Sequence, residues 1–189
     1  MKHASALAWT LAVLLLPLPA ASQDPIPFVP SPMIVVERML ELAEVKKDDV
    51  VYDLGSGDGR ILITAAKKYG ARGVGIDMNP DLVREATRKA KEAGVGHLVE
   101  FRAGDALAVD LSEATVVTLY MFKWFNNAIR PKLQKLRPGA RVVAHDFDID
   151  DWPPTRVVYV NPGDDPSGEL YDSRTLFLWK IGATPPAVP

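Results

Sequence analysis

The residues VVYDLGSGDGR, positions 50–60, decide the fold of this chain. The β-branched and apolar start of this stretch predicts a short buried strand over residues 50–54. Three glycines at alternate positions follow, and they let the backbone turn sharply and approach a ligand without Cβ collisions: Gly55, Gly57 and Gly59. Apolar residues at helical spacing over 61–69 come next, so the turn leads into a helix whose free N–H groups can face a carboxylate or phosphate.

The same alternation of strand and helix continues on both sides of this stretch. Strands are predicted over 73–76, 97–102, 115–119 and 141–147, and helices over 32–42, 79–93 and 123–136. Ser31 is expected to cap the first helix, with Pro32 at its first position. Two last strands, over 155–160 and 175–181, have no helix between them. The expected fold is α/β, a Rossmann-like, mostly parallel sheet of seven strands with a C-terminal antiparallel hairpin and helices on both faces.

Composition narrows the class of protein. The 189 residues include 22 Lys and Arg against 24 Asp and Glu, a formal net charge of −2. With 48% hydrophobic residues, this length suits one globular domain. A chain without a basic face cannot displace counterions from phosphates, so we expect no nucleic-acid partner. The absence of Cys excludes disulfides, cysteine nucleophiles and thiolate metal sites.

The N-terminus has the pattern of a targeting segment. Lys2 precedes an apolar run over 4–18, and small residues at 20–22 offer a cleavage site. The run is shorter than the ~20 residues that span a bilayer, which favours a signal peptide over an uncleaved anchor. We therefore expect an exported, periplasmic domain, or one whose only membrane contact is this segment. The expected organisation is a leader over 1–22, a Pro-rich lead-in over 23–31, the main domain over 32–182 and a loose tail over 183–189.

Three acidic residues stand at the ends of the first three predicted strands. Asp53 directly precedes the glycine-rich turn, Asp77 ends the second strand, and Asp105 follows the third. Because the carboxyl ends of parallel strands meet at one edge of a sheet, these side chains should lie close together. A carboxylate after the second strand can accept both ribose hydroxyls, and one after the third can accept an adenine amino proton. The pattern predicts an adenosine-containing cofactor.

This constellation resembles the class I S-adenosylmethionine-dependent methyltransferases over residues 30–181. The resemblance is carried by residues 51–60, 75–77, 104–106 and 136–141. It implies that S-adenosyl-L-methionine is the cofactor, with its methionine part held by the turn and Asp53, its ribose by Asp77 and its adenine by Asp105. The cofactor-binding residues so implied are Asp53, Gly55, Ser56, Gly57, Gly59, Asp77, Met78, Asp105 and Ala106. Dinucleotide-binding oxidoreductases are the rival family, but they prefer G-x-G-x-x-G and lack the terminal hairpin.

Residues 28–32, 35–40 and 53–60 carry a narrower resemblance. They look like the small lysine methyltransferases related to the ATP-synthase c-subunit methyltransferase and, more distantly, Dot1. In those proteins the segment before the first helix folds over the cofactor, which implies that Phe28 and Ser31 line this site. The stretches after the fourth and fifth strands, 119–122 and 144–147, do not match closely enough to carry over a lysine substrate.

The predicted activity is methyl transfer to a nitrogen acceptor, with a protein lysine as one candidate. Displacement on a sulfonium needs alignment and a dry pocket rather than a nucleophile. Tyr120 and Asp146, which end the fourth and fifth strands, are the catalytic candidates, against a packed aromatic and a solvated acid as alternatives. Two alternatives stay open. One is a small-molecule N- or O-methyltransferase, and the other is a catalytically silent module that binds S-adenosylmethionine or S-adenosylhomocysteine. The partner is thus a methyl-acceptor protein or small molecule, and the cytosolic origin of the cofactor conflicts with an exported domain.

The sequence predicts no metal site. Four acidic residues between 146 and 151 resemble the start of a calcium loop, yet Trp152-Pro153-Pro154 replaces its glycine turn. His97 and His145 have no partner at metal-ligand spacing. The oligomeric state stays open.

Overall fold

The computed structural model describes residues 28–183. Its helices are α1 (Met33–Leu42), α2 (Arg60–Tyr69), α3 (Pro80–Glu92) and α4 (Lys123–Leu133), with one 3-10 turn, η1 (Pro162–Asp164). Its strands are β1 (Val50–Leu54), β2 (Arg72–Asp77), β3 (Val99–Ala103), β4 (Val116–Leu119), β5 (Arg141–His145), β6 (Arg156–Val160) and β7 (Arg174–Lys180). Each strand and helix that the sequence predicts is present, with ends displaced by a few residues.

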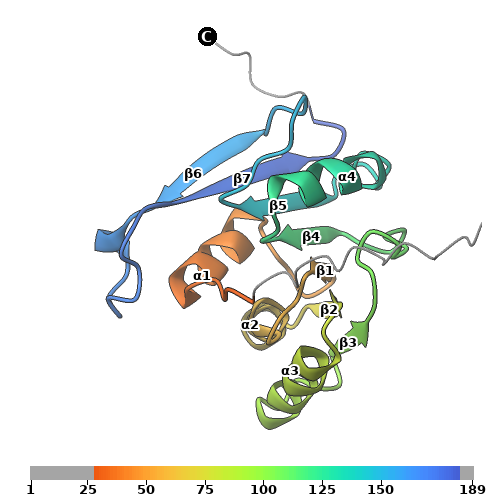
Figure 1. Cartoon of the computed structure of the whole chain (residues 1–189), viewed down its shortest axis with the longest axis vertical. Coiled ribbons are helices and arrows are strands. Elements are labelled where there is room, and N and C mark those ends of the chain that lie inside the picture. Colours follow the sequence, from red (N-terminus) through yellow and green to blue (C-terminus); the bar gives the residue numbers. More distant parts are fainter. Residues whose placement is uncertain (1–27, 184–189) are drawn as a thin grey trace, which may run out of the picture.

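All seven strands form one sheet in the order β3-β2-β1-β4-β5-β7-β6 (Figure 1). The pairs among β1 to β5 are parallel, whereas β7 pairs antiparallel with both β5 and β6. This confirms the expected parallel sheet with a C-terminal antiparallel hairpin. The strand order reverses between β1 and β4, and the carboxyl ends of these strands are where ligands bind in open α/β sheets.

Helices cover both faces of the sheet, as expected. On one face, Leu62 of α2 belongs to a buried cluster with Val51 of β1 and residues of α1 and α3. On the other face, Phe125 of α4 packs in a second cluster with Leu54 of β1. Figure 1 shows α1, α2 and α3 along one side of the strands. Alternate residues of β1 thus pack into the two clusters, because successive side chains of a strand point to opposite faces of the sheet.

The cap predicted for the first helix is wrong. Pro32 is the N-cap residue of α1, the helix begins at Met33, and no side chain caps it. The Ser31 hydroxyl lies 2.9 Å from Nδ1 of His145, a buried residue at the end of β5. The Ser31 hydroxyl therefore contacts His145, which is distant in the sequence, instead of capping the helix that follows it. Strand β5 also ends two residues earlier than predicted, because Asp146 adopts a left-handed conformation with φ 61°.

Gly59 supports the packing of the domain behind the glycine-rich turn. It is the N-cap of α2 with φ 79°, and an added Cβ would lie 2.6 Å from Phe101 Cζ and 2.9 Å from Ala86 Cβ. We expect Gly59→Ala to lower the free energy of unfolding by about 2 kcal/mol, through left-handed strain and overpacking. Urea unfolding measures this loss. Gly163→Ala, where a Cβ would meet nothing within 4 Å, is the matched control and should change stability by less than about 0.5 kcal/mol.

Candidate functional site

A cavity of about 540 Å³ opens at the carboxyl ends of β1, β2, β3 and β4. Its wall is built from the lead-in residues 28–31, the glycine-rich turn, the ends of β2 and β3 and the residues after β4. Cavities of roughly 300–1,000 Å³ with an apolar lining and a few polar groups are typical of small-molecule sites. The predicted strand-end residues therefore surround a real cavity.

Neighbouring side chains and the cavity occupy the space that side chains on the glycine-rich turn would fill. A Cβ on Gly57 would lie 2.3 Å from Cε2 of Phe28, and one on Gly55 would lie 2.5 Å from Sδ of Met121. Both glycines have positive φ, 52° and 83°, which other residues rarely adopt. Between them, the buried Ser56 hydroxyl has no hydrogen-bond partner within residues 28–183. This hydroxyl packs beside Gly75 of β2, where an added Cβ would lie 2.8 Å from Oγ, and it is closed off from the open cavity.

Asp77 joins the turn to the end of β2. Its Oδ2 accepts a hydrogen bond from the Gly57 N–H and its Oδ1 accepts one from the Asn79 N–H, both at 2.8 Å. The carboxylate is thereby fixed at the cavity wall, and each oxygen keeps a lone pair that can accept a further hydrogen bond. Met78, Asp105 and Ala106 continue the same wall, with Met78 largely exposed.

Asp53 is the most buried acid of the cavity wall. The residue is 2% exposed, and its Oδ1 accepts a hydrogen bond from the Thr118 hydroxyl at 2.7 Å. Burial raises the pKa of Asp53 to about 7, and the nearby charges of Asp77 and Asp58 add to the rise. A carboxyl group with this pKa takes up or releases its proton near neutral pH, so a cationic ligand group beside it would favour the ionised form.

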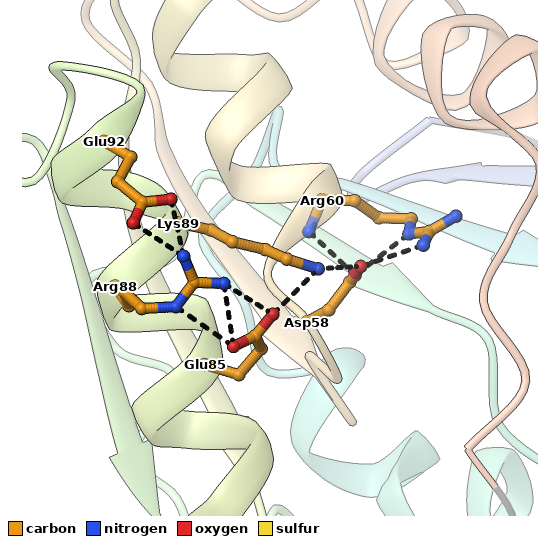
Figure 2. A network of polar contacts seen from close by, with 6 residues as sticks. All are labelled: Asp58, Arg60, Glu85, Arg88, Lys89 and Glu92. Carbon is orange, nitrogen blue, oxygen red and sulfur yellow. Dashed lines mark hydrogen bonds and ion pairs between the residues drawn. The ribbon is translucent and has the colours of Figure 1, made fainter.

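Asp58 organises a network of charges that begins in the cavity wall with Asp58 and Arg60 and extends to α3, as Figure 2 shows. Its carboxylate pairs with Arg60 at 2.8 Å and with Lys89 of α3 at 3.0 Å. Burial alone would raise the pKa of Asp58, but these two cations outweigh it and hold the pKa at about 2. Arg60 also donates to the Ser31 carbonyl at 2.9 Å, which ties the lead-in to the turn. The network continues along α3 through Glu85, Arg88 and Glu92.

Sequence reasoning missed the roles of Asp58 and Arg60. The one local signal was an acid and a base flanking the last glycine of the turn, a pattern that many surface turns share. Their partners, Ser31 and Lys89, lie 29 and 31 residues away in the sequence.

The side of the cavity beyond β4 is aromatic and apolar. Tyr120, Met121, Trp124 and Phe125 line it. The Tyr120 ring stacks on the imidazole of His145 with ring centroids 3.9 Å apart and planes 25° apart. Burial raises the pKa of the Tyr120 hydroxyl, so this group keeps its proton at neutral pH.

Two of the residues predicted for the site do not line the cavity. Gly59 lies behind the turn against Phe101. Asp146 points its carboxylate towards β7, where Oδ1 accepts from the Thr175 N–H at 3.0 Å and Oδ2 accepts from Arg174 at 3.2 Å. The structure brings the other predicted residues to the cavity wall: Phe28, Ser31, Asp53, Gly55, Ser56, Gly57, Asp77, Met78, Asp105, Ala106 and Tyr120.

The acidic loop after β5 is occupied by protein cations. Lys123 pairs with Asp148 at 2.9 Å and with Asp150 at 2.7 Å. Within residues 28–183, no group of three or more His, Cys, Asp or Glu side chains is arranged to hold a metal ion. No helix in that part of the chain has the length and apolar character to cross a membrane. The predicted leader over 1–22 lies outside the described residues.

Comparisons with known proteins define the class. A crystal structure described as an RNA methyltransferase from Salinibacter ruber with S-adenosyl-L-homocysteine is 53% identical, with a TM-score of 0.72, and covers 85% of this chain and 97% of its own. A protein-lysine N-methyltransferase of Saccharolobus islandicus is 44% identical over 159 residues, 83% of this chain and 94% of the relative. With this fold and cavity, the protein is an S-adenosylmethionine-dependent methyltransferase.

The family within this class is also clear. The model of the ANTKMT methyltransferase domain matches residues 53–156, and the chain belongs to this family. The ATP synthase c-subunit lysine N-methyltransferase of Xenopus laevis is 34% identical over 166 residues, 87% of this chain and 68% of the relative. Both resemblances drawn from the sequence are therefore confirmed, together with the enzyme class and the cofactor.

Proposed function

We propose that this enzyme transfers a methyl group to the side-chain amine of a protein lysine. The observation that carries the proposal is the acceptor side of the cavity, where Tyr120, Met121 and Trp124 form an apolar wall next to the glycine-rich turn. Such a wall suits the aliphatic stem of a lysine, and the Tyr120 oxygen can accept a hydrogen bond from the amine. The relatives named as lysine methyltransferases, 44% and 34% identical, support the same acceptor.

The residues of the wall fit S-adenosylmethionine in three places. The Cβ-free turn of Gly55, Ser56 and Gly57, together with Asp53, would hold its methionine part, with Asp53 next to the amino group. Asp77 would accept hydrogen bonds from the ribose hydroxyls. Asp105 already accepts from the Leu107 N–H at 2.8 Å through Oδ1, and its other oxygen would accept from the adenine amine.

The protein residues mainly align the acceptor and exclude water. The bound cofactor supplies a methyl group on a sulfonium, which is already activated for in-line displacement. The amine must arrive neutral, with its lone pair free, and Tyr120 can orient it through an N–H. Neither His145 nor Asp146 is placed to take this proton, because neither lines the cavity, and burial also lowers the pKa of His145 to about 4. The wall carboxylates of Asp53, Asp77 and Asp105 would be engaged by the cofactor, so we expect the amine to lose its proton to water before it enters the cavity.

A labelled-methyl assay separates lysine from the other acceptors. The full chain is incubated with S-adenosylmethionine carrying a labelled methyl group and a cell lysate, followed by complete acid hydrolysis of the protein and nuclease digestion of the nucleic acid. We expect the label in methylated lysine, and none above background with Asp77→Ala. Label in methylated nucleosides would overturn the proposal and match the name of the Salinibacter relative. Label in small molecules alone would favour the small-molecule alternative, and folded enzyme that binds cofactor without transfer would indicate a silent module.

The titration of Asp53 should make cofactor affinity depend on pH. Asp53 must ionise to pair with the cofactor's amino group, and its pKa in the unliganded protein is about 7. Affinity for S-adenosylhomocysteine should therefore rise about fivefold between pH 6 and pH 7, a range in which the ligand's own amine stays protonated. Calorimetry measures this. Asp53→Asn, which can still accept from Thr118, should bind more weakly and show no such rise, and an unchanged slope in the variant would contradict the assignment.

The leader supports a further part of the proposal. Residues 1–22 would export the domain or anchor it to a membrane, where its acceptor would then be found. Cell fractionation with mass spectrometry of the mature N-terminus tests this, since export with cleavage would leave an N-terminus near residue 23. Full-length protein in the soluble cytosolic fraction would contradict it.

A further inference from the structure

His145 is a fully buried side chain that touches both sides of the cavity without lining it. Its Nδ1 lies 2.9 Å from the hydroxyl of Ser31, which belongs to the lead-in on the cofactor side. Its ring stacks on Tyr120, which lines the acceptor side, at 3.9 Å between centroids. Residue 145 is 0% exposed, so each of these contacts is protected from water.

The groups around the His145 imidazole determine its tautomer and its charge. The groups that face it are Ser31, Tyr120, Asp146 and Arg174. Asp146 Oδ2 lies 3.4 Å from Nε2, and Nε2 has no hydrogen-bond partner within residues 28–183. A proton on Nε2 is the favourable arrangement, since it brings the positive end of an N–H near the carboxylate and leaves Nδ1 to accept from the Ser31 hydroxyl. Burial keeps the ring neutral at physiological pH by lowering its pKa.

The lead-in depends on few contacts for its position over the cavity. At Ser31, the carbonyl accepts from Arg60 on one side and the hydroxyl meets His145 on the other. Phe28, three residues earlier, covers Gly57 of the turn. Loss of either contact at Ser31 would free a segment that lines the cavity, whereas loss of the stacking would free the Tyr120 ring.

We propose that His145 is a positioning residue for methyl transfer, which fixes the cofactor-side lead-in through Nδ1 and the acceptor-side Tyr120 through its ring face. The inference rests on the proposed placement of the cofactor and the amine on these two sides. The alignment of donor and acceptor is the main contribution an enzyme of this class can make, and small misplacements cost large factors in rate. One side chain that holds both walls would therefore set their relative position.

Two substitutions at this position separate the two contacts. His145→Phe keeps a ring against Tyr120 but removes the hydrogen bond to Ser31. His145→Asn places an amide oxygen near the position of Nδ1, where it can accept from the Ser31 hydroxyl, but removes the ring. Ser31→Ala deletes the same hydrogen bond from its other end, which gives a milder variant if a substitution in the core fails to fold.

The experiment compares cofactor affinity with turnover in the full-length chain. Calorimetry with S-adenosylhomocysteine gives the Kd, and labelled-methyl transfer into lysate gives the apparent kcat and the KM for S-adenosylmethionine. We expect His145→Phe and Ser31→Ala each to raise the Kd about fivefold with kcat within about twofold. The double variant Ser31→Ala with His145→Phe should bind S-adenosylhomocysteine no more weakly than either single variant, because both substitutions remove the same hydrogen bond. His145→Asn should keep the Kd within about twofold and lower kcat about tenfold.

This split is a result that a purely structural role would not produce. Parallel losses of affinity and rate in His145→Phe and His145→Asn, in proportion to their loss of thermal stability, would overturn the proposal. An unchanged Kd in Ser31→Ala, or additive effects in the double variant, would overturn it as well. If the wild type labelled nucleosides instead of lysine, the proposed acceptor would be wrong, and the S-adenosylhomocysteine measurements would still decide the role of His145.

Discussion

Replacing Asp77 with alanine is expected to weaken the binding of S-adenosylhomocysteine by about 100-fold, the largest loss of affinity among single substitutions in the cavity wall. The Asp77 carboxylate accepts from the N–H groups of Gly57 and Asn79, both at 2.8 Å, so it fixes the turn and the start of α3 at once. In the proposed complex the same oxygens also accept from the ribose. Hydrogen bonds to a charged group contribute roughly 1.5–3 kcal/mol each, and the loss of two at the ligand accounts for a factor of this size.

Calorimetry at pH 7 measures this loss, with two further variants for comparison. Asp77→Asn keeps one acceptor oxygen and should lose about tenfold. Asp81→Ala removes an exposed carboxylate four residues away, on the first turn of α3, where its partner is Arg84. This matched control should leave the Kd within about twofold, because exposed ion pairs contribute little. A loss below about threefold in Asp77→Ala would place the ribose elsewhere.

Asp77 also illustrates why much of the fold and site could be predicted from the sequence. Burial on both faces makes parallel strands apolar, and this pattern marks β1, β2 and β4 in the sequence itself. The carboxyl ends of parallel strands share one edge, so acids at the ends of β1 and β2 had to converge. The sheet topology and the comparisons confirm the predicted fold, cofactor and family, while the role of each site residue stays a prediction.

What the sequence could not reveal are the contacts between distant side chains. Ser31 and His145 are 114 residues apart, and local rules assign the first to a helix cap and the second to an ordinary core or surface position. Asp146 stands at the correct edge of the sheet, but its left-handed backbone, φ 61°, directs the carboxylate to Thr175 and Arg174. Neither the conformation nor the partners leave a trace in periodicity or spacing.

For the same reason, the sequence did not predict the ion pair at the amino ends of the parallel strands. Arg141 begins β5 and holds Asp49, just before β1, through two bonds of 2.7 and 3.0 Å. The Asp49 residue is 6% exposed, and its carboxylate also accepts from the Thr115 hydroxyl at 2.6 Å and the Lys46 N–H at 2.7 Å. Burial alone would raise the pKa of Asp49, but these donors, with Arg141 first, lower it below 3.8.

Arg141→Met is expected to lower the free energy of unfolding by about 3–5 kcal/mol at pH 7, the cost of leaving a buried carboxylate without its partner. In the wild type, the stability from Asp49 is present above its unfolded pKa of 3.8 and is lost as pH falls through the lower folded value. In the variant the folded pKa of Asp49 rises instead, because burial is no longer opposed by Arg141. The variant therefore gains stability as pH falls towards 4, and its difference from the wild type narrows.

Urea unfolding at pH 7 and pH 4.5 tests both the size and the sign of this effect. The double variant Asp49→Asn with Arg141→Met removes the charge as well as its partner, so it should be more stable at pH 7 than Arg141→Met alone. If Arg141→Met lost less than about 1 kcal/mol of unfolding free energy, the pair would not stabilise the fold as a buried ion pair should. A double variant no more stable than Arg141→Met at pH 7 would lead to the same conclusion. Because Asp49 and Arg141 lie at the amino ends of β1 and β5, away from the cavity, folded Arg141→Met should bind S-adenosylhomocysteine as the wild type does.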